Sequence, residues 1–252
     1  MENITPRTLR LCVIENGLVP AELRNRFASY PAMIKHWLSP SLPEAVFSQV
    51  SPVSGEPLPD PATFDGYILT GSKHSCYEGT LWMEDLKRFL QQLREQRRPV
   101  FGICFGHQIM ADAYGGRTRR AEQGWGVGAQ PYQYADSVPA AGAAFVFHQD
   151  QVVDLPPGAE VLGGSSHCRQ GVLGYPFPAL SVQYHPEFPP SYVEALARRY
   201  SGNLLPRKVA DTALSSLERI GVDNTQIAAW VASFFREHGA PAVIESQQEN
   251  RA

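Results

Sequence analysis

The stretch Pro99-Val-Phe-Gly-Ile-Cys104-Phe-Gly-His-Gln108 decides how this chain folds. A short apolar run leads into the pattern Gly-x-Cys-x-Gly, and helical periodicity follows as far as Tyr114. This order predicts a strand over 99–103, a sharp turn at Cys104 and a helix over 106–114. It is the arrangement of a nucleophile elbow, with cysteine in the position that serine often occupies.

The predicted turn gives Cys104 the properties of a nucleophile. Its sulfur projects into the open, and the N-terminus of the following helix favours the thiolate over the thiol. Gly102 and Gly106 remove side chains that would clash where the strand and the helix approach each other. The N–H of Phe105 points at the reaction centre and supplies one half of an oxyanion hole. A buried structural cysteine is the alternative interpretation, because free cysteines are often buried.

The rest of the chain alternates short apolar runs with helical patterns, which predicts an α/β fold with a mostly parallel central sheet flanked by helices. The other expected strands cover 9–14, 45–50 and 67–70 and, in a region of short segments between Gly and Pro turns, 127–134, 144–147 and 160–163. The other expected helices cover 21–38 with a break or new start at Pro31, 81–96, 192–200 and a C-terminal segment in which Ile227, Trp230, Val231 and Phe234 share one face.

The C-terminal part of the chain is expected to be helical. We predict one domain over residues 1–200 and a helical extension over 201–252 that packs on the same domain. About fifty residues follow Tyr200, enough for one or two helices. Asp223 or Asn224 is a candidate N-cap for the last helix. Residues after about 240 are expected to form a frayed tail.

The composition is that of a globular protein. The chain has 252 residues, of which 43% are hydrophobic and 19% charged, and its net charge is −3. No basic face points to nucleic acid, and no apolar stretch approaches the roughly 20 residues needed to cross a bilayer. The four cysteines form no CxxC pair and no disulfide scaffold. Since the N-terminus carries no signal-peptide pattern, we expect a cytoplasmic protein that binds neither nucleic acid nor membranes.

A cysteine nucleophile needs a histidine base, and the segment Leu180-Ser-Val-Gln-Tyr-His185-Pro-Glu187-Phe188 offers one. His185 follows an apolar run, so we place it at the end of a strand. Parallel sheets bind ligands at the carboxyl ends of their strands, where Cys104 is also expected. Pro186 ends the strand, and Glu187 can return to accept the second N–H of the imidazole. The alternatives are an interfacial histidine and a solvated loop carboxylate, but the joint pattern with the cysteine motif favours catalysis.

The other histidines have weaker claims to a function. His107 follows the cysteine motif and is expected to pack under the helix rather than to meet a substrate. No pair of histidines has metal-ligand spacing with a plausible third ligand. We therefore predict a site without a metal and without a cofactor.

Three segments resemble the class I, triad-type glutamine amidotransferases in order and spacing. They are Thr70-Gly-Ser-Lys-His-Ser-Cys-Tyr77, Gly102-Ile-Cys-Phe-Gly-His-Gln108 and Gln183-Tyr-His-Pro-Glu-Phe188. The resemblance is strongest to the amidotransferase domain of GMP synthetase and its stand-alone relatives, and it covers residues 9–200. It implies the flavodoxin-like α/β fold of that family.

The resemblance also implies a role for each matching residue. Cys104 would attack the carboxamide carbon of glutamine and form a γ-glutamyl thioester, with release of ammonia. His185 would take the thiol proton and protonate the departing amine, and Glu187 would hold His185. The main-chain N–H groups of Ser72 and Phe105 would form the oxyanion hole. The substrate would be bound by residues on the surrounding segments, namely Gly71, Gln108, His148 and Gln149.

Two departures from the family pattern concern what the site binds. The loop after the third strand usually reads Gly-Gly-Pro or Asn-Gly-Pro in the family, whereas here it reads Gly71-Ser72-Lys73. A backbone oxyanion hole tolerates the serine, but Lys73 and His74 could alter what enters the site. In the segment Phe147-His148-Gln149, the glutamine replaces a usual glycine, which points to a different γ-glutamyl substrate. A plain turn between strands is the alternative interpretation of this segment.

Three functions fit these residues. The first is a glutamine amidotransferase or glutaminase that passes ammonia from glutamine to a separate synthase chain. The second is a free-standing γ-glutamyl hydrolase or peptidase with the same triad, which Gln149 and the lack of a recognisable synthase domain favour. The third is a non-catalytic binding or regulatory protein, against which the intact Cys104, His185 and Glu187 argue. We expect an enzyme, and place the first function slightly ahead of the second.

Overall fold

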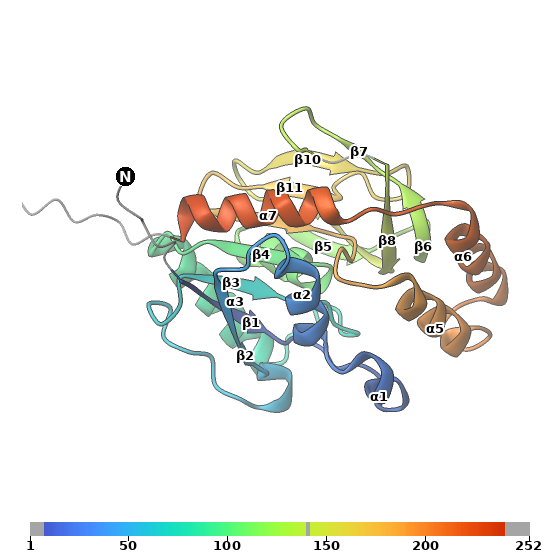
Figure 1. The fold of residues 1–252 in the computed structure, drawn as a ribbon, viewed down its shortest axis with the longest axis horizontal. Coiled ribbons are helices and arrows are strands. Elements are labelled where there is room, and N and C mark those ends of the chain that lie inside the picture. Colours follow the sequence, from blue (N-terminus) through green and yellow to red (C-terminus); the bar gives the residue numbers. More distant parts are fainter. Residues whose placement is uncertain (1–7, 140–141, 240–252) are drawn as a thin grey trace, which may run out of the picture.

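The computed structural model describes residues 8–139 and 142–239, and its centre is a twisted sheet (Figure 1). Within the described residues this sheet has eight strands in the order β2-β1-β3-β4-β12-β11-β10-β7. The first five are parallel to one another, and β11, β10 and β7 follow at one edge, each antiparallel to the strand before it. The α/β fold with a largely parallel sheet is therefore as predicted.

The strands of the central sheet are β1 (Leu9–Ile14), β2 (Ala45–Val50), β3 (Gly66–Leu69), β4 (Val100–Ile103), β7 (Gln133–Tyr134), β10 (Glu160–Gly164), β11 (Val172–Gly174) and β12 (Ala179–Val182). Two further antiparallel pairs stand beside it: β5 (Arg117–Arg120) with β9 (Asp150–Asp154), and β6 (Gly126–Pro131) with β8 (Ala143–His148).

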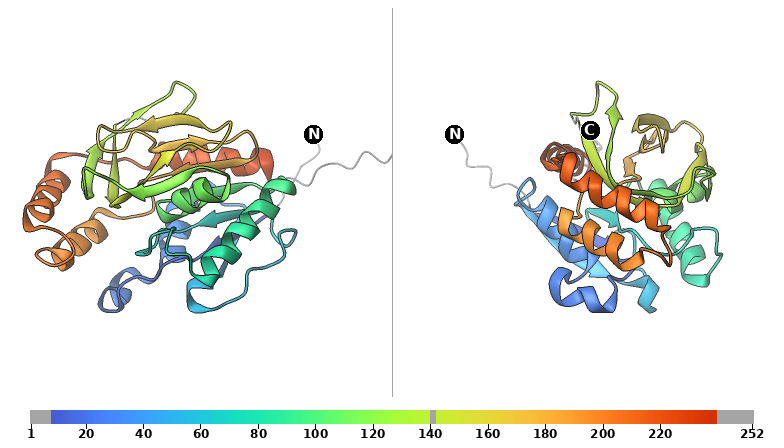
Figure 2. Two further views of the ribbon diagram at one scale, coloured as in Figure 1. Left: turned by 180° about the vertical axis from the view of Figure 1, so that it is seen from behind. Right: turned by 90° about the vertical axis from the view of Figure 1, so that its right-hand side faces the viewer.

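Helices cover both faces of the sheet. The α-helices are α1 (Arg24–Phe27), α2 (Tyr30–Leu38), α3 (Leu81–Glu95), α4 (Phe105–Ala113), α5 (Pro190–Tyr200), α6 (Arg207–Arg219) and α7 (Thr225–His238), with short 3-10 turns at Ala21–Leu23 and Pro52–Ser54. Helices α2 and α7 lie on the face seen in Figure 1, and α3 and α4 lie on the face seen from behind in Figure 2. Helices α5 and α6 pack beside the β6–β8 pair.

The two faces of β1 show why the sheet needs both helical layers. Leu11 and Val13 point into the apolar cluster shared with α2 and α7, whereas Cys12 and Ile14 point into the cluster shared with α3 and α4. All four side chains are buried. Because side chains alternate across a strand, a continuous apolar run is stable only where both faces are covered.

The predicted elements agree with the structure along most of the chain. Of the two candidate N-caps of the last helix, Asn224 holds the N-cap position, but its side chain makes no capping bond. Its neighbour Asp223 accepts hydrogen bonds from the N–H and hydroxyl of Thr225. Helix α6 was not predicted as a separate element. The frayed tail after residue 240 lies outside the described residues, and the division at residue 200 stays a prediction.

The topology brings two strand ends together. Strands β4 and β12 are parallel neighbours, with Ile103 paired to Val182 at their carboxyl ends. Cys104 and the turn that holds His185 follow these ends directly, so the sheet places them at one edge. Within the described part of the chain, no helix is long and apolar enough to span a membrane.

The packing of α4 against β3 gives a first prediction. A Cβ added at Gly106 would lie 2.6 Å from the carbonyl oxygen of Leu69, so Gly106→Ala forces the helix away from the strand. We expect the free energy of unfolding to fall by about 1–3 kcal/mol, as for overpacked cores. Urea denaturation measures the change.

Gly221→Ala is the matched control, because an added Cβ at Gly221 meets nothing within 4 Å. Its free energy of unfolding should stay within about 0.5 kcal/mol of wild type. Equal effects of the two substitutions would show that the close approach of α4 to β3 does not limit stability.

Candidate active site

Cys104 occupies a turn conformation that side chains rarely adopt. Its backbone has φ 52° and ψ −100°, and helix α4 begins at the next residue, Phe105. Such a conformation costs of order 1–3 kcal/mol and persists only where the surroundings enforce it. Gly102 makes the close packing around this turn possible, because an added Cβ there would collide with the sulfur of Met110 and lie 2.8 Å from the backbone of Gly106. Strand and helix thus meet at the elbow that the sequence predicts.

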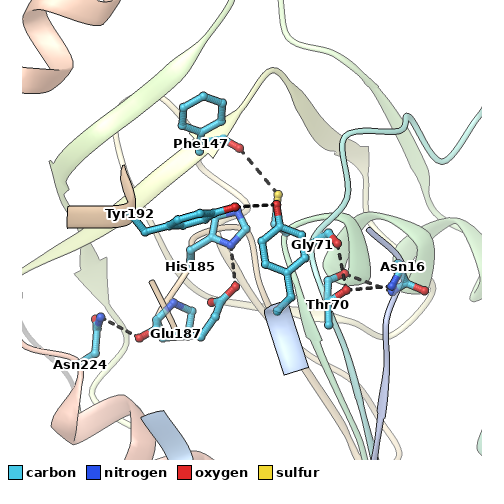
Figure 3. Close-up of polar contacts among 11 residues, drawn as sticks. Asn16, Thr70, Gly71, Phe147, His185, Glu187, Tyr192 and Asn224 are labelled. Carbon is cyan, nitrogen blue, oxygen red and sulfur yellow. Dashed lines mark hydrogen bonds and ion pairs between the residues drawn. The ribbon is translucent and has the colours of Figure 1, made fainter. Parts of the chain in front are cut away.

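The turn after β12 carries a buried histidine–carboxylate pair. The Nδ1 atom of His185 lies 2.8 Å from Oε1 of Glu187 (Figure 3). The two side chains are 5% and 0% exposed, so the hydrogen bond is shielded from water. With Nδ1 engaged by the carboxylate, Nε2 is the ring nitrogen left for Cys104.

The charge state of His185 follows from three opposing effects. Burial alone would lower the pKa of His185, because it disfavours the imidazolium. The negative charges of Glu187 and Cys104, with the hydrogen bonds to both residues, outweigh burial and raise the pKa from 6.5 to about 10. His185 is therefore an imidazolium at neutral pH, which is the partner that a cysteine thiolate requires.

Two contacts from elsewhere in the chain fix the His185–Glu187 turn. The side-chain amide of Asn224, just before α7, donates to the carbonyl oxygen of Pro186 over 2.9 Å (Figure 3). The ring of Phe188 stacks on the imidazole of His185 with centroids 3.8 Å apart and an angle of 8° between the planes. The sequence motif contained Phe188, but nothing in the pattern around Asn224 indicated this contact.

The loop after β3 lies against the same histidine. A Cβ added at Gly71 would lie 2.7 Å from Cε1 of His185 and 3.7 Å from Cβ of Cys104, so only glycine fits here. Asn16 holds the start of this loop through two hydrogen bonds to Thr70 (Figure 3). The structure therefore brings Gly71, and Ser72 after it, to the Cys104 elbow, where the N–H groups of Ser72 and Phe105 are the predicted oxyanion donors.

The predicted substrate-binding residues differ in where their side chains lie. Gln108 is buried and donates to the carbonyl of Asp150 and to the side chain of Gln183. His148 is buried beside Phe147, whose carbonyl lies 4.0 Å from the Cys104 sulfur (Figure 3). The side chain of Gln149 accepts a hydrogen bond from exposed Arg120 and so turns toward the surface.

Asp150 joins the loop after β3 to strand β9. Its carboxylate accepts a hydrogen bond from the hydroxyl of Ser75 over 2.5 Å and another from Tyr77 over 3.1 Å. Its carbonyl accepts from Gln108 and lies 3.2 Å from Nδ1 of His148. This network fixes the loop that contains Ser72, and sequence reasoning did not identify it because its members are far apart along the chain.

Two other expectations concern histidines and metals. His107 is fully buried, and its Nδ1 lies 2.8 Å from the hydroxyl of Ser181, so it packs under α4 as predicted. Burial lowers the pKa of His107 to about 3, which keeps its ring neutral. Among the residues that the structure describes, no group of three or more His, Cys, Asp or Glu side chains is arranged to hold a metal ion.

The comparison with protein families shows the family of the chain. Residues 46–195 match the family described as glutamine amidotransferase class-I. The chain belongs to this family. The match includes the Cys104 elbow and the His185–Glu187 turn, and it ends within α5.

The relatives of this chain include proteins named as gamma-glutamyl peptidases and as GMP synthases. Gamma-glutamyl peptidase 3 of Arabidopsis thaliana is 30% identical over 168 residues, which cover 62% of this chain and 68% of the peptidase. A glutamine-hydrolyzing GMP synthase subunit of Methanocaldococcus jannaschii is 33% identical over 134 residues, which cover 48% of this chain and 64% of that protein. The crystal structure of a glutamine amidotransferase from Thermotoga maritima shares the fold, with a TM-score of 0.71 at 18% identity over 92% of this chain and 99% of that one.

The buried pair gives a prediction for the pH dependence of stability. The folded-state pKa of His185 is raised to about 10. Protonation of His185 therefore adds fully to the free energy of unfolding below the unfolded pKa of about 6.5, and this stabilisation is lost as the pH rises through 10. Glu187→Gln removes the charge that holds the imidazolium. We expect the stability difference between wild type and variant to be largest near pH 6 and to shrink toward pH 10, measured by urea denaturation.

Glu160→Gln, at an exposed carboxylate on β10, is the control and should show no such trend. A stability difference for Glu187→Gln that stays constant from pH 6 to pH 10 would contradict the assigned charge state of His185.

Proposed function

We propose that this protein hydrolyses γ-glutamyl amides through a thioester on Cys104, with His185 as the proton carrier and Glu187 as the residue that orients it. The observation that carries the proposal is the buried His185–Glu187 hydrogen bond beside the Cys104 elbow. His185 is bound to Glu187 at 2.8 Å and has its pKa raised to about 10 by charges that include Cys104. An imidazolium held beside a cysteine on a nucleophile elbow is the arrangement that acyl transfer needs.

The first half of the reaction forms the acyl-enzyme. The Cys104 thiolate attacks the γ-carbonyl carbon, and the carbonyl oxygen takes up the negative charge. The N–H groups of Ser72 and Phe105 stabilise this oxyanion. The imidazolium of His185 then gives its proton to the departing nitrogen, the C–N bond breaks, and the γ-glutamyl group stays on the sulfur as a thioester.

The second half returns the enzyme to its starting state. His185 is now neutral and takes a proton from a water molecule, which attacks the thioester carbon. Glutamate leaves, and Cys104 departs as a thiolate beside the re-formed imidazolium. Glu187 keeps the ring in one orientation throughout, so Nε2 serves both proton transfers.

Two substrate classes fit this chemistry. Relatives named gamma-glutamyl peptidase match 62% to 69% of this chain, whereas those named GMP synthase match 48% of it. The wider match favours γ-glutamyl peptides or conjugates, with an amino acid or peptide as the leaving group. Glutamine is the second candidate, and its ammonia would pass to a separate synthase chain, as the relation to a GMP synthase subunit suggests.

Turnover by the purified chain tests the proposal. Cys104→Ala should lower the kcat for γ-glutamyl amides by at least about 10⁴-fold, because the chemistry proceeds through the sulfur. Cys12→Ala removes a buried sulfur on β1 and is the matched control, so it should retain activity. The measurement is the release of glutamate, and of ammonia or the free amine, from L-glutamine and from γ-glutamyl dipeptides.

The outcomes separate the alternatives. Cys104-dependent cleavage of dipeptides supports the peptidase, and Cys104-dependent ammonia from glutamine supports the amidotransferase. Turnover that survives Cys104→Ala would refute the mechanism. If the wild-type chain cleaves neither substrate and Cys104 fails to react with a glutamine-like electrophile, the protein is a binding protein instead.

A further inference from the structure

Tyr30, which no sequence motif contains, is held beside the active site by a strained turn. It is the first residue of α2, and the hydroxyl of Ser29 caps that helix by accepting the N–H of Ala32. Ala28, just before the cap, has φ 57°. A positive φ is costly for alanine and persists only where the surroundings enforce it. The strained turn and the capped helix together fix the position of the Tyr30 ring.

A stack of rings connects Tyr30 to His185. Phe188 stacks on His185, and Tyr30 stacks on Phe188 with centroids 5.7 Å apart and planes 26° apart. Tyr192 on α5 meets both rings edge-on, at 6.2 Å from Tyr30 and 4.6 Å from Phe188. Phe188 and Tyr192 are buried, whereas Tyr30 is partly exposed. Tyr30 is thus the residue of this cluster that retains accessible surface.

The Tyr30 hydroxyl retains a proton that it can donate. The hydroxyl of Tyr192 donates to that of Tyr30 over 3.3 Å, the bond drawn at the Tyr192 hydroxyl in Figure 3. One bond between two hydroxyls uses one of their two protons. Burial raises the pKa of Tyr30 well above 10, and the nearby charges of Glu187 and Cys104 raise it further, so the phenol stays protonated at every pH at which the enzyme would work.

The position of Tyr30 in the site determines which part of a substrate it can contact. Tyr30 stands on the His185 side of the site, because it stacks on Phe188 and Phe188 stacks on His185, and His185 must stand next to the departing nitrogen in order to protonate it. Gln108 and His148, the predicted γ-glutamyl contacts, are joined instead to Asp150 on β9.

We infer that Tyr30 binds the leaving group of the substrate, and that its O–H donates a hydrogen bond to a carbonyl or carboxylate oxygen of a departing amino acid or peptide. The inference rests on the proposed function and refines it. Ammonia has no such oxygen, so Tyr30 favours γ-glutamyl peptides over glutamine. The role of Tyr192 is to hold the Tyr30 hydroxyl in place.

Tyr30→Phe tests the inference, because it removes the hydroxyl and keeps the stacked ring. For γ-glutamylglycine we expect kcat/KM to fall about tenfold, the loss typical of one hydrogen bond. For L-glutamine the change should be less than twofold. Tyr192→Phe should give the same pattern with a smaller loss. Tyr200→Phe, on the same helix as Tyr192, is the matched control and should leave kcat/KM unchanged for both substrates.

A second readout shows that the nucleophile is intact. The rate at which iodoacetamide alkylates Cys104 should be the same in Tyr30→Phe and wild type. If the wild type cleaves both substrates and Tyr30→Phe lowers kcat/KM equally for both or for neither, the inference is overturned and the proposed function stands. If the wild type cleaves neither substrate, the proposed function fails and the inference fails with it.

Discussion

The close contact among the β4–α4 turn, the end of β3 and His185 is the constraint on which the site depends. Three glycines meet there, and an added Cβ would lie 2.6 Å from Leu69 at Gly106, 2.8 Å from the backbone of Gly106 at Gly102, and 2.7 Å from His185 at Gly71. Without side chains at these positions, α4 can start directly after β4 and the β3 loop can reach the histidine. Cys104 is held at a positive φ by this packing, and the strain is offset by burial of the surrounding core.

Electrostatics adds a second constraint to the packing. Burying a histidine and a carboxylate costs free energy that their attraction only partly restores. Here the charges of Glu187 and Cys104 and the hydrogen bonds to both residues outweigh burial and raise the pKa of His185, and the ring of Phe188 stacks on its imidazole. The chain before α7 contributes through Asn224, whose amide holds the peptide between His185 and Glu187. A segment outside the matched family region thereby stiffens the turn that contains His185 and Glu187.

The sequence predicts features that depend on neighbouring residues better than features that depend on contacts between residues far apart along the chain. Short apolar runs predicted the strands β1, β3 and β4, which are buried, and the partly exposed strand β2. The motifs around Cys104 and His185 predicted the residues that meet at the sheet edge. Helix α6 is predicted only as part of a helical extension, although Val209, Leu214 and Leu217 recur at helical spacing and pack against the neighbouring apolar clusters. The sequence does not indicate Tyr30, because its partner Tyr192 lies 162 residues away and no local pattern predicts a contact over that separation. The local pattern does not choose between Asp223 and Asn224 as the N-cap; in the structure the Asn224 side chain binds Pro186, and Asp223 accepts the N–H of Thr225.

The central claim is that a γ-glutamyl group passes through the sulfur of Cys104. The most direct test is the intact mass of the protein after rapid acid quenching of a reaction with a γ-glutamyl dipeptide, followed by peptide mapping. The thioester mechanism predicts a mass increase of one γ-glutamyl group, located on Cys104. This adduct should be absent in Cys104→Ala and should be removed by hydroxylamine, which cleaves thioesters. Turnover with no adduct under any quench time, or an adduct on another residue, would contradict it.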